Sequence, residues 1–256
     1  FSSFTHSNLT KPCPSPLAPH YSPTRNGLLP TAVLLHRHYI IVIASMVGAE
    51  GQRPPLTATA EQIQLMLNVI ENEIMPKTRM SVQSGNKVFG AAILNPDFSC
   101  CLASTNAETD CPLFHGEVKC IYDWSKQTPA SERGLAAQSS IFLCTHEPCC
   151  MCVASILWSG FNTIFYWLPY ETTTAQGIPH DVDTMHELWG VTEYRRRNKY
   201  FASACLQSLI EECSDNDDVK TDLMAQSGRL LERYDAMSDQ YHEEKGDNKN
   251  NTLVLG

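Results

Sequence analysis

Residues 140–168 read SIFLCTHEPCCMCVASILWSGFNTIFYWL, and this stretch decides the fold. It opens with a nearly continuous apolar run, Ser140 to Thr145, which is typical of a strand buried on both faces. A helix is predicted over Cys149 to Trp158, because Pro148 at its start lacks only an N–H group that would have no partner there. A second buried strand is predicted over Asn162 to Leu168. Strand, helix and strand in this order predict a right-handed parallel unit.

The segments before this unit predict a helix and a hairpin. Thr59 to Met75 has the spacing of an amphipathic helix. Either Thr57 or Thr59 is expected to cap it, and Pro76 to end it. Val88 to Leu94 and Ser99 to Thr105 are apolar runs on either side of a turn triplet. Two such runs around a turn indicate a β-hairpin.

The remaining elements carry a weaker pattern. His115 to Trp124 has helical spacing, with its apolar residues on a common face. Pro169 to Asp183 is predicted to be a long loop, Asp183 to Trp189 a short helix and Glu193 to Cys213 a longer helix. A fifth strand is predicted near Gly190 to Thr192. Together these elements predict an α/β fold with a mixed sheet of about five strands and helices packed on it.

Composition divides the chain of 256 residues into three parts. Residues 1–56 are predicted to be a low-complexity, disordered leader, since the first 49 contain no Asp or Glu and are rich in Pro, Ser and Thr. Residues 57–213 have the size of an ordinary single domain. Residues 214–256 are acidic and polar, which predicts a solvated helix with a frayed end, or a disordered tail.

The leader leaves two explanations open. It resembles an organelle transit peptide in its lack of acidic residues. Alternatively, residues 1–45 are an upstream extension or a fragment boundary, because the first methionine of the chain is Met46. Its apolar run, Tyr39 to Val47, is far shorter than the ~20 residues needed to cross a bilayer, so no membrane span is predicted.

Charge and cysteine content restrict the class of protein. The net charge of −9 disfavours a broad nucleic-acid-binding face, which needs clustered Lys and Arg. Such a cluster occurs at residues 195–197, and an exposed helical turn explains it more simply than an RNA contact. The chain has 11 cysteines but also long apolar segments that can build a core without disulfides. A reducing, cytoplasmic location is therefore expected.

Two short fragments carry the chemistry: His115-Gly116-Glu117 and Pro148-Cys149-Cys150-Met151-Cys152. Zinc accepts imidazole nitrogen and thiolate sulfur, and a catalytic zinc site keeps one of its four positions for water. One histidine and two cysteines leave that position open. A lone CxxC pair is also compatible with a redox motif, a structural zinc site or two buried thiols, but the upstream His-x-Glu favours a catalytic zinc site.

The two fragments are expected to meet in space. His115 opens one helix and Cys149 opens the other, and both helices are expected on one face of the sheet because the strand between them connects them. Their N-termini then converge, and unpaired N–H groups at a helix start favour thiolate. Glu117 makes better chemical sense as a proton carrier than as a fourth ligand, which would close the site.

The pattern His-x-Glu followed by Pro-Cys-x-x-Cys resembles the cytidine-deaminase-like zinc deaminases. The longer stretch Thr145 to Cys152 resembles the T-x-E-P-C-x-M-C form of tRNA adenosine deaminases and guanine deaminases. Of these two groups, Ile156 to Ser159 more closely resembles the guanine deaminases. The resemblance covers residues 59–168. It implies a three-layer α/β/α sandwich, zinc ligands at His115, Cys149 and Cys152, and a proton shuttle at Glu117.

The resemblance also implies a substrate contact and a reaction. Asn106 matches the asparagine that holds the base in purine deaminases of this family, and Gly116 stands where alanine is usual. The expected reaction is zinc-dependent hydrolytic deamination of a nucleobase or nucleoside, a purine such as guanine in the first place, with release of ammonia. Adenosine deamination in tRNA, alone or with a partner subunit, and a catalytically idle zinc-stabilised subunit remain as alternatives. A homodimer is expected by analogy with the family.

Overall fold

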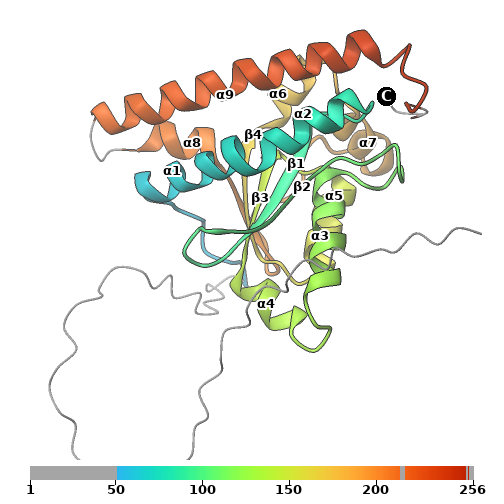
Figure 1. Ribbon diagram of the computed structural model, residues 1–256. Helices are drawn as coiled ribbons and strands as arrows, with labels where there is room; N and C mark the ends of the chain where they lie inside the picture. The colour runs from blue at the N-terminus through green and yellow to red at the C-terminus, as the bar shows by residue number, and fades with distance from the viewer. Residues whose placement is uncertain (1–50, 214–216, 252, 254–256) are drawn as a thin grey trace, which may run out of the picture. The chain divides into compact units, whose positions relative to one another are not determined.

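A mixed five-stranded sheet forms the centre of the fold in the computed structural model, which describes residues 51–213, 217–251 and 253 (Figure 1). The strands are β1 (Gly90–Leu94), β2 (Cys100–Thr105), β3 (Ile141–His146), β4 (Thr163–Leu168) and β5 (Ala202–Cys205). Their order across the sheet is β2-β1-β3-β4-β5. β1 is antiparallel to β2 and to β3, whereas β3, β4 and β5 run parallel to one another. The predicted hairpin and the predicted parallel strand–helix–strand unit are both confirmed.

Helices cover both faces of this sheet (Figure 1). One layer contains α1 (Ala60–Val69), a π-helical turn η1 (Ile70–Ile74), α2 (Met75–Gln83), α8 (Leu206–Glu212) and α9 (Asp217–Glu244). The other contains α3 (Gly116–Gln127), α4 (Arg133–Ser139) and α5 (Cys150–Trp158). Alternate residues of a strand face opposite sides. Ile141 and Leu143 of β3 accordingly belong to the first hydrophobic cluster, while Phe142 and Cys144 belong to the second. The predicted three-layer α/β/α architecture is therefore confirmed.

The first helix is capped as predicted but does not end at Pro76. Thr59 accepts a hydrogen bond from the N–H of Gln62, and the Gln62 side chain accepts one from the N–H of Thr59, which completes a capping box. Pro76 lies in the first turn of α2, which follows η1 directly. In η1 the N–H of Met75 donates to the carbonyl of Ile70, one residue further back than in an α-helix. A π-helical turn is a known cause of local helix distortion, and here it accommodates the proline ring without ending the helix.

Three predictions for the chain after β4 are wrong. The segment predicted as a loop contains α6 (Tyr170–Ala175) and the start of α7 (His180–Trp189). The fifth strand is β5 rather than residues 190–192, so the long helix predicted over residues 193–213 reduces to α8. β5 reads Ala-Ser-Ala-Cys and lacks the β-branched or aromatic residues that mark a strand in sequence. Its parallel pairing with β4 decides its conformation.

The acidic C-terminal part is helical, but it is not only a solvated tail. α9 has 28 residues. One face of it packs against α1, α2 and α8 and belongs to the same hydrophobic cluster. Its buried apolar and aromatic side chains in that cluster are Leu223, Leu230, Tyr234, Met237 and Tyr241. The Nε1–H of Trp167 in β4 donates to Ser227 of α9 at 2.8 Å. The boundary expected at residue 213 therefore falls inside the packed layers.

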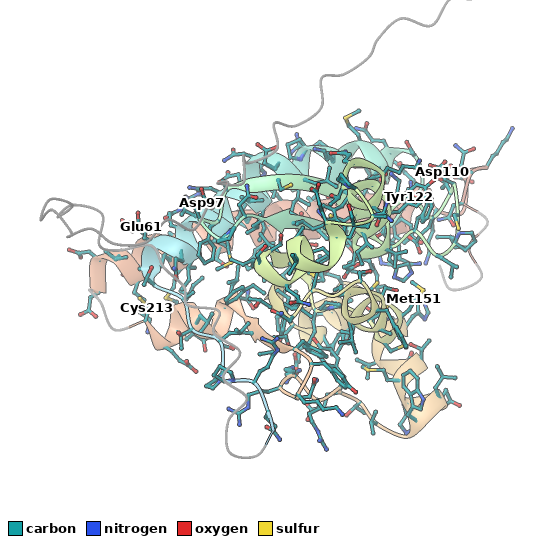
Figure 2. All side chains as sticks on the ribbon, turned by 90° about the horizontal axis from the view of Figure 1, so that it is seen from below. Glu61, Asp97, Asp110, Tyr122, Met151 and Cys213 are labelled. Carbon is teal, nitrogen blue, oxygen red and sulfur yellow. The ribbon has the colours of Figure 1, made fainter. Side chains whose placement is uncertain are left out.

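The starts of α3 and α5 lie at one end of the domain. Asp110, in the loop before α3, and Met151, in the first turn of α5, lie at the same end in Figure 2, opposite Glu61 and Cys213. The expected leader falls on residues 1–50, outside the described part of the chain, and so does the apolar run at residues 39–47. Within the described part, no helix is both long and apolar enough to cross a membrane.

Candidate metal centre and adjoining cavity

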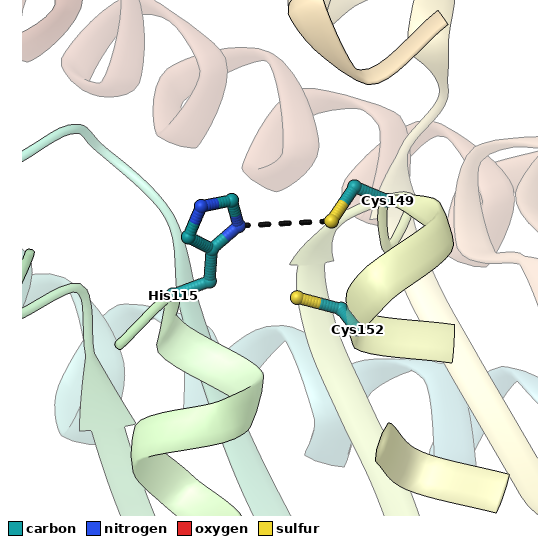
Figure 3. A group of neighbouring side chains, drawn as sticks. All are labelled: His115, Cys149 and Cys152. Atoms are coloured by element: carbon teal, nitrogen blue, oxygen red, sulfur yellow. Dashed lines mark hydrogen bonds between the residues drawn. The ribbon is translucent and has the colours of Figure 1, made fainter. Parts of the chain in front are cut away.

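Three side chains from two helix starts form a group able to hold a metal ion. His115 is the N-cap of α3, Cys149 is the N-cap of α5, and Cys152 lies in the first turn of α5. Their ligand atoms all lie within 4.8 Å of one another. Nδ1 of His115 is 3.6 Å from Sγ of Cys149, and both sulfurs point toward the ring (Figure 3). The expected convergence of the two helix starts is confirmed, since α3 and α5 pack against each other.

The three side chains of this cluster shift one another's pKa values. A hydrogen bond from Cys152, together with His115, holds the pKa of the Cys149 thiol well below its usual range despite burial. Burial raises the pKa of Cys152 well above its usual range, and the neighbouring Cys149 raises it further. Burial alone would lower the pKa of His115, but the hydrogen bond and charge of Cys149 raise it to about 9. In the metal-free site these shifts favour a Cys149 thiolate beside a protonated His115 over two neutral groups.

Glu117 lies beside the cluster in the first turn of α3. Only 5% of its surface is exposed, and it forms a hydrogen bond with Cys152. Burial raises the pKa of Glu117 to about 7, and the negative charge of Cys149 adds to the effect. A carboxyl group with such a pKa can both accept and release a proton near neutral pH.

A buried polar network adjoins the other side of His115, and sequence reasoning missed two of its members. Glu108 is 3% exposed, and its Oε1 is 2.9 Å from Nζ of Lys87 and 3.5 Å from Nε2 of His115. Asn106 donates from Nδ2 to Glu108 at 2.7 Å and accepts from the N–H of Gly116 at 2.5 Å. Both ends of the Asn106 amide are thus engaged with the protein. No spacing rule marks a loop glutamate or a strand-flanking lysine as part of a site.

A cavity of about 390 Å³ opens over His115 and Cys149. Its walls include the apolar side chains of Phe89, Met151, Ile178 and Leu188, and its polar lining includes Lys87, Glu108, His180, Asp181 and Thr184. Asp181 is 9% exposed, and burial raises its pKa well above the usual range. The sequence pattern did not single out this aspartate. Asn106 does not line the cavity, and His186 is exposed outside it.

The arginine cluster at residues 195–197 does not form a helical turn. Instead, Arg196 forms a two-point hydrogen-bonded ion pair with the fully buried carboxylate of Glu147. Its Nε donates to Oε1 at 2.7 Å and its Nη2 donates to Oε2 at 3.1 Å. The N–H of Glu147 donates to the carbonyl of Leu168. Glu147 therefore braces the chain between β3 and α5, just before the two cysteines.

Gly116 is required by close packing. A Cβ atom at this position would lie 2.8 Å from Cα of Gly90 and 3.0 Å from the carbonyl oxygen of Phe89. These are backbone atoms of β1 and of the residue before it, which cannot rotate away as a side chain can. The first turn of α3 can therefore approach the start of β1 only because residue 116 has no side chain.

Comparison with known proteins places the chain in a family. Residues 31–168 match the family described as the cytidine and deoxycytidylate deaminase zinc-binding region. No curated protein matches the chain. Among solved structures, a guanine deaminase from Nitrosomonas europaea is 15% identical with a TM-score of 0.43, over 72% of this chain and 87% of that chain.

Two further solved structures are similar at lower scores. A guanine deaminase from Bacillus subtilis is 21% identical with a TM-score of 0.38, over 50% of this chain and 83% of that chain. A structure from work on A-to-I editing by tRNA:A34 deaminases is 15% identical with a TM-score of 0.33, over 51% of this chain and 92% of that chain. The family match spans more than half of the chain and includes His115, Cys149 and Cys152. This protein therefore belongs to the zinc-binding family of cytidine and deoxycytidylate deaminases.

Proposed function

We propose that His115, Cys149 and Cys152 bind zinc and that the protein catalyses hydrolytic deamination of a nucleobase or nucleoside, with a purine such as guanine as substrate. The observation that carries this proposal is the close group of one imidazole and two sulfurs beside a buried carboxyl group, two members of which, His115 and Cys149, line a cavity. Three protein ligands suit a catalytic zinc site, which keeps a position for water. Zinc held there would lower the pKa of a bound water from ~15.7 to about 7.

Glu117 is the proton carrier of the proposed reaction. Water oxygen forms a bond to the amino-bearing ring carbon, and the Glu117 carboxylate takes the proton that the water loses. The same carboxyl group delivers this proton to the adjacent ring nitrogen. A second transfer carries the remaining hydroxyl proton to the amino group, the carbon–nitrogen bond breaks, and ammonia leaves. Burial raises the pKa of Glu117 to about 7 in the metal-free site, which supports its assignment as a group that exchanges a proton rather than one that is always ionised.

The cavity supports a planar heterocyclic substrate. Its volume of about 390 Å³ lies within the usual range for small-molecule sites. Phe89, Ile178 and Leu188 provide apolar surface for the faces of a ring. We propose that the Asp181 carboxyl, which lines the cavity, accepts a hydrogen bond from an amino or ring N–H group, which guanine has on its base-pairing edge.

For Asn106 we propose a supporting role in place of the expected direct contact with the base. Because its amide oxygen accepts from the N–H of Gly116, the side chain acts on the first turn of α3. We propose that Asn106 supports the placement of His115 and Glu117, with direct contact to the base requiring a change of its present hydrogen bonds.

An ammonia-release screen tests the proposed function. The substrates are guanine, adenine, cytosine, their nucleosides and a tRNA anticodon stem. Release from guanine is expected, and release from the anticodon stem alone would replace the free base by tRNA as substrate. Purified protein is expected to contain about one zinc per chain, and Cys149→Ala is expected to lose both metal and activity.

The matched pair Glu117→Gln and Glu61→Gln tests the proton carrier. Both residues occupy the first turn of a helix, but Glu61 is exposed at the opposite end of the domain (Figure 2). Glu117→Gln is expected to retain zinc and to lose about 10² to 10⁴ in turnover. Glu61→Gln is expected to match the unmodified protein. Normal turnover in Glu117→Gln would reject the assigned role.

A further inference from the structure

We infer that Glu108 is a positioning residue that fixes the orientation of the His115 ring, and that Lys87 and Asn106 hold Glu108 in place for this purpose. The inference rests on the proposed role of His115 as a metal ligand. It assigns a function to a buried carboxylate that lies seven positions before the histidine, in the loop between β2 and α3.

The two nitrogens of His115 face opposite partners. Nδ1 lies 3.6 Å from Sγ of Cys149, on the side of the metal cluster. Nε2 lies 3.5 Å from Oε1 of Glu108, on the far side of the ring. A histidine that uses one ring nitrogen as a ligand carries its proton on the other, and a carboxylate facing that N–H group fixes both the tautomer and the ring orientation. Glu108 therefore directs Nδ1 toward the sulfurs.

Glu108 is itself held from several directions. Its Oε1 is 2.9 Å from Nζ of Lys87, and its Oε2 is 3.4 Å from the N–H of Lys87 and 2.7 Å from Nδ2 of Asn106. The side chains of Glu108 and Lys87 are 2% and 7% exposed, respectively. A buried carboxylate is tolerated only when it is paired and hydrogen-bonded. These contacts leave the carboxylate little freedom, so its position is suited to fixing that of the ring.

Asn106 connects this network to the start of α3. Its Oδ1 accepts the N–H of Gly116 while its Nδ2 donates to Glu108. The residue that follows His115 and the carboxylate behind the His115 ring are thus held by the same amide. The backbone and the side chain of His115 are therefore oriented together.

Zinc affinity separates this role from simple charge neutralisation of Lys87. Three variants are compared with the unmodified protein: Glu108→Gln, Asp110→Asn, and the double variant Lys87→Met with Glu108→Gln. Asp110 is the matched control, because it is a carboxylate two residues away in the same loop but exposed (Figure 2). The double variant leaves no unpaired buried charge, which protects the comparison from a simple loss of folding.

The dissociation constant of zinc is measured by competition with a chelator, and the melting temperature of each metal-free variant is measured alongside it. Loss of a residue that supports a metal ligand typically weakens metal binding by about 10- to 100-fold. This weakening is expected in Glu108→Gln and in the double variant, but not in Asp110→Asn. The visible spectrum of the Co²⁺-loaded protein, which reports the geometry around the metal, is expected to change in the same two variants.

The outcomes that overturn the inference are specific. Unchanged zinc affinity in Glu108→Gln would remove the positioning role, as would equal weakening in Asp110→Asn. Return of the double variant to the original affinity would mean that Glu108 serves only to neutralise Lys87. None of these results depends on which substrate is turned over, so failure of this inference is distinct from failure of the proposed deaminase activity.

Discussion

Replacing Gly116 by alanine tests how tightly the metal centre depends on the contact between α3 and β1. Alanine is the usual residue here in the family that the motif resembles, and it has the higher helix propensity, by up to about 1 kcal/mol. On propensity alone the variant would be more stable. The structure predicts the reverse, because the new Cβ atom would meet backbone rather than solvent.

The magnitude follows from the distances. The Cβ atom would lie 2.8 Å from Cα of Gly90, whereas ordinary contacts begin at 3.4 Å, so α3 and β1 must separate by about 0.6 Å. Gly90 cannot retreat easily, because its N–H and its carbonyl both bond to the hydroxyl of Thr145 in β3. Overpacking of this kind costs about 1 to 3 kcal/mol. Subtracting the full gain in propensity leaves a net loss of up to about 2 kcal/mol, which lowers the melting temperature by up to roughly 8 °C.

The same displacement moves His115 and Glu117 relative to the cysteines of α5. If about 1.4 kcal/mol of the strain is relieved when the metal leaves, the dissociation constant of zinc rises about tenfold. Thermal unfolding and chelator competition measure the two effects. Gly134→Ala is the control, since Gly134 lies in the first turn of α4 with open space around its Cβ position. A Gly116→Ala protein that is as stable as the Gly134→Ala protein and binds zinc normally would refute the packing argument.

Three further predictions concern charge and protonation. Arg196→Met is expected to lower the free energy of unfolding by roughly 1 to 3 kcal/mol, because the buried carboxylate of Glu147 loses its partner. Chemical denaturation measures this loss. Adding Glu147→Gln to the variant should restore part of it. The zinc affinity is expected to rise with pH between about 6 and 8. The pKa of His115 in the metal-free site is about 9, so zinc must displace a proton from its ring to bind. An affinity that falls with pH in chelator competition would contradict this prediction. Burial lowers the pKa of His146 to about 4. The unfolded chain therefore takes up a proton below its pKa of about 6.5 while the folded protein does not, so stability is lost as pH falls through the window from about 6.5 to 4. The loss reaches about 2 kcal/mol at pH 5, and denaturation of His146→Gln should show a shallower decline.

Local pattern predicted the elements that carry a continuous apolar run or a clear turn or helix-start signal. The strands and helix within residues 140–168 were predictable because a strand buried on both faces carries a continuous apolar run wherever it occurs. The hairpin of β1 and β2 was predictable because its turn residues lie between two such runs. In contrast, β5 has only four small residues, and nothing in them specifies a strand until β4 provides an edge for pairing.

Tertiary contacts also changed the meaning of two strong local signals. Pro76 normally ends a helix, but the π-helical turn before it lets the chain continue into α2. The acidic composition after residue 213 suggested a solvated segment, yet a few apolar residues on one face of α9 were enough to bind it to the core. Average composition does not reveal a stripe that faces inward.

The amino-acid sequence by itself determined the chemistry available to this protein: one histidine, two cysteines and one glutamate at spacings that suit two helix starts. This was possible because metal ligands are specific side chains whose spacing along a helix is fixed by its geometry. Only the tertiary structure decided which groups surround them. Glu108 and Asp181 are brought to the site by loops and helix packing, and contacts between residues far apart in the chain leave no periodic trace in the sequence.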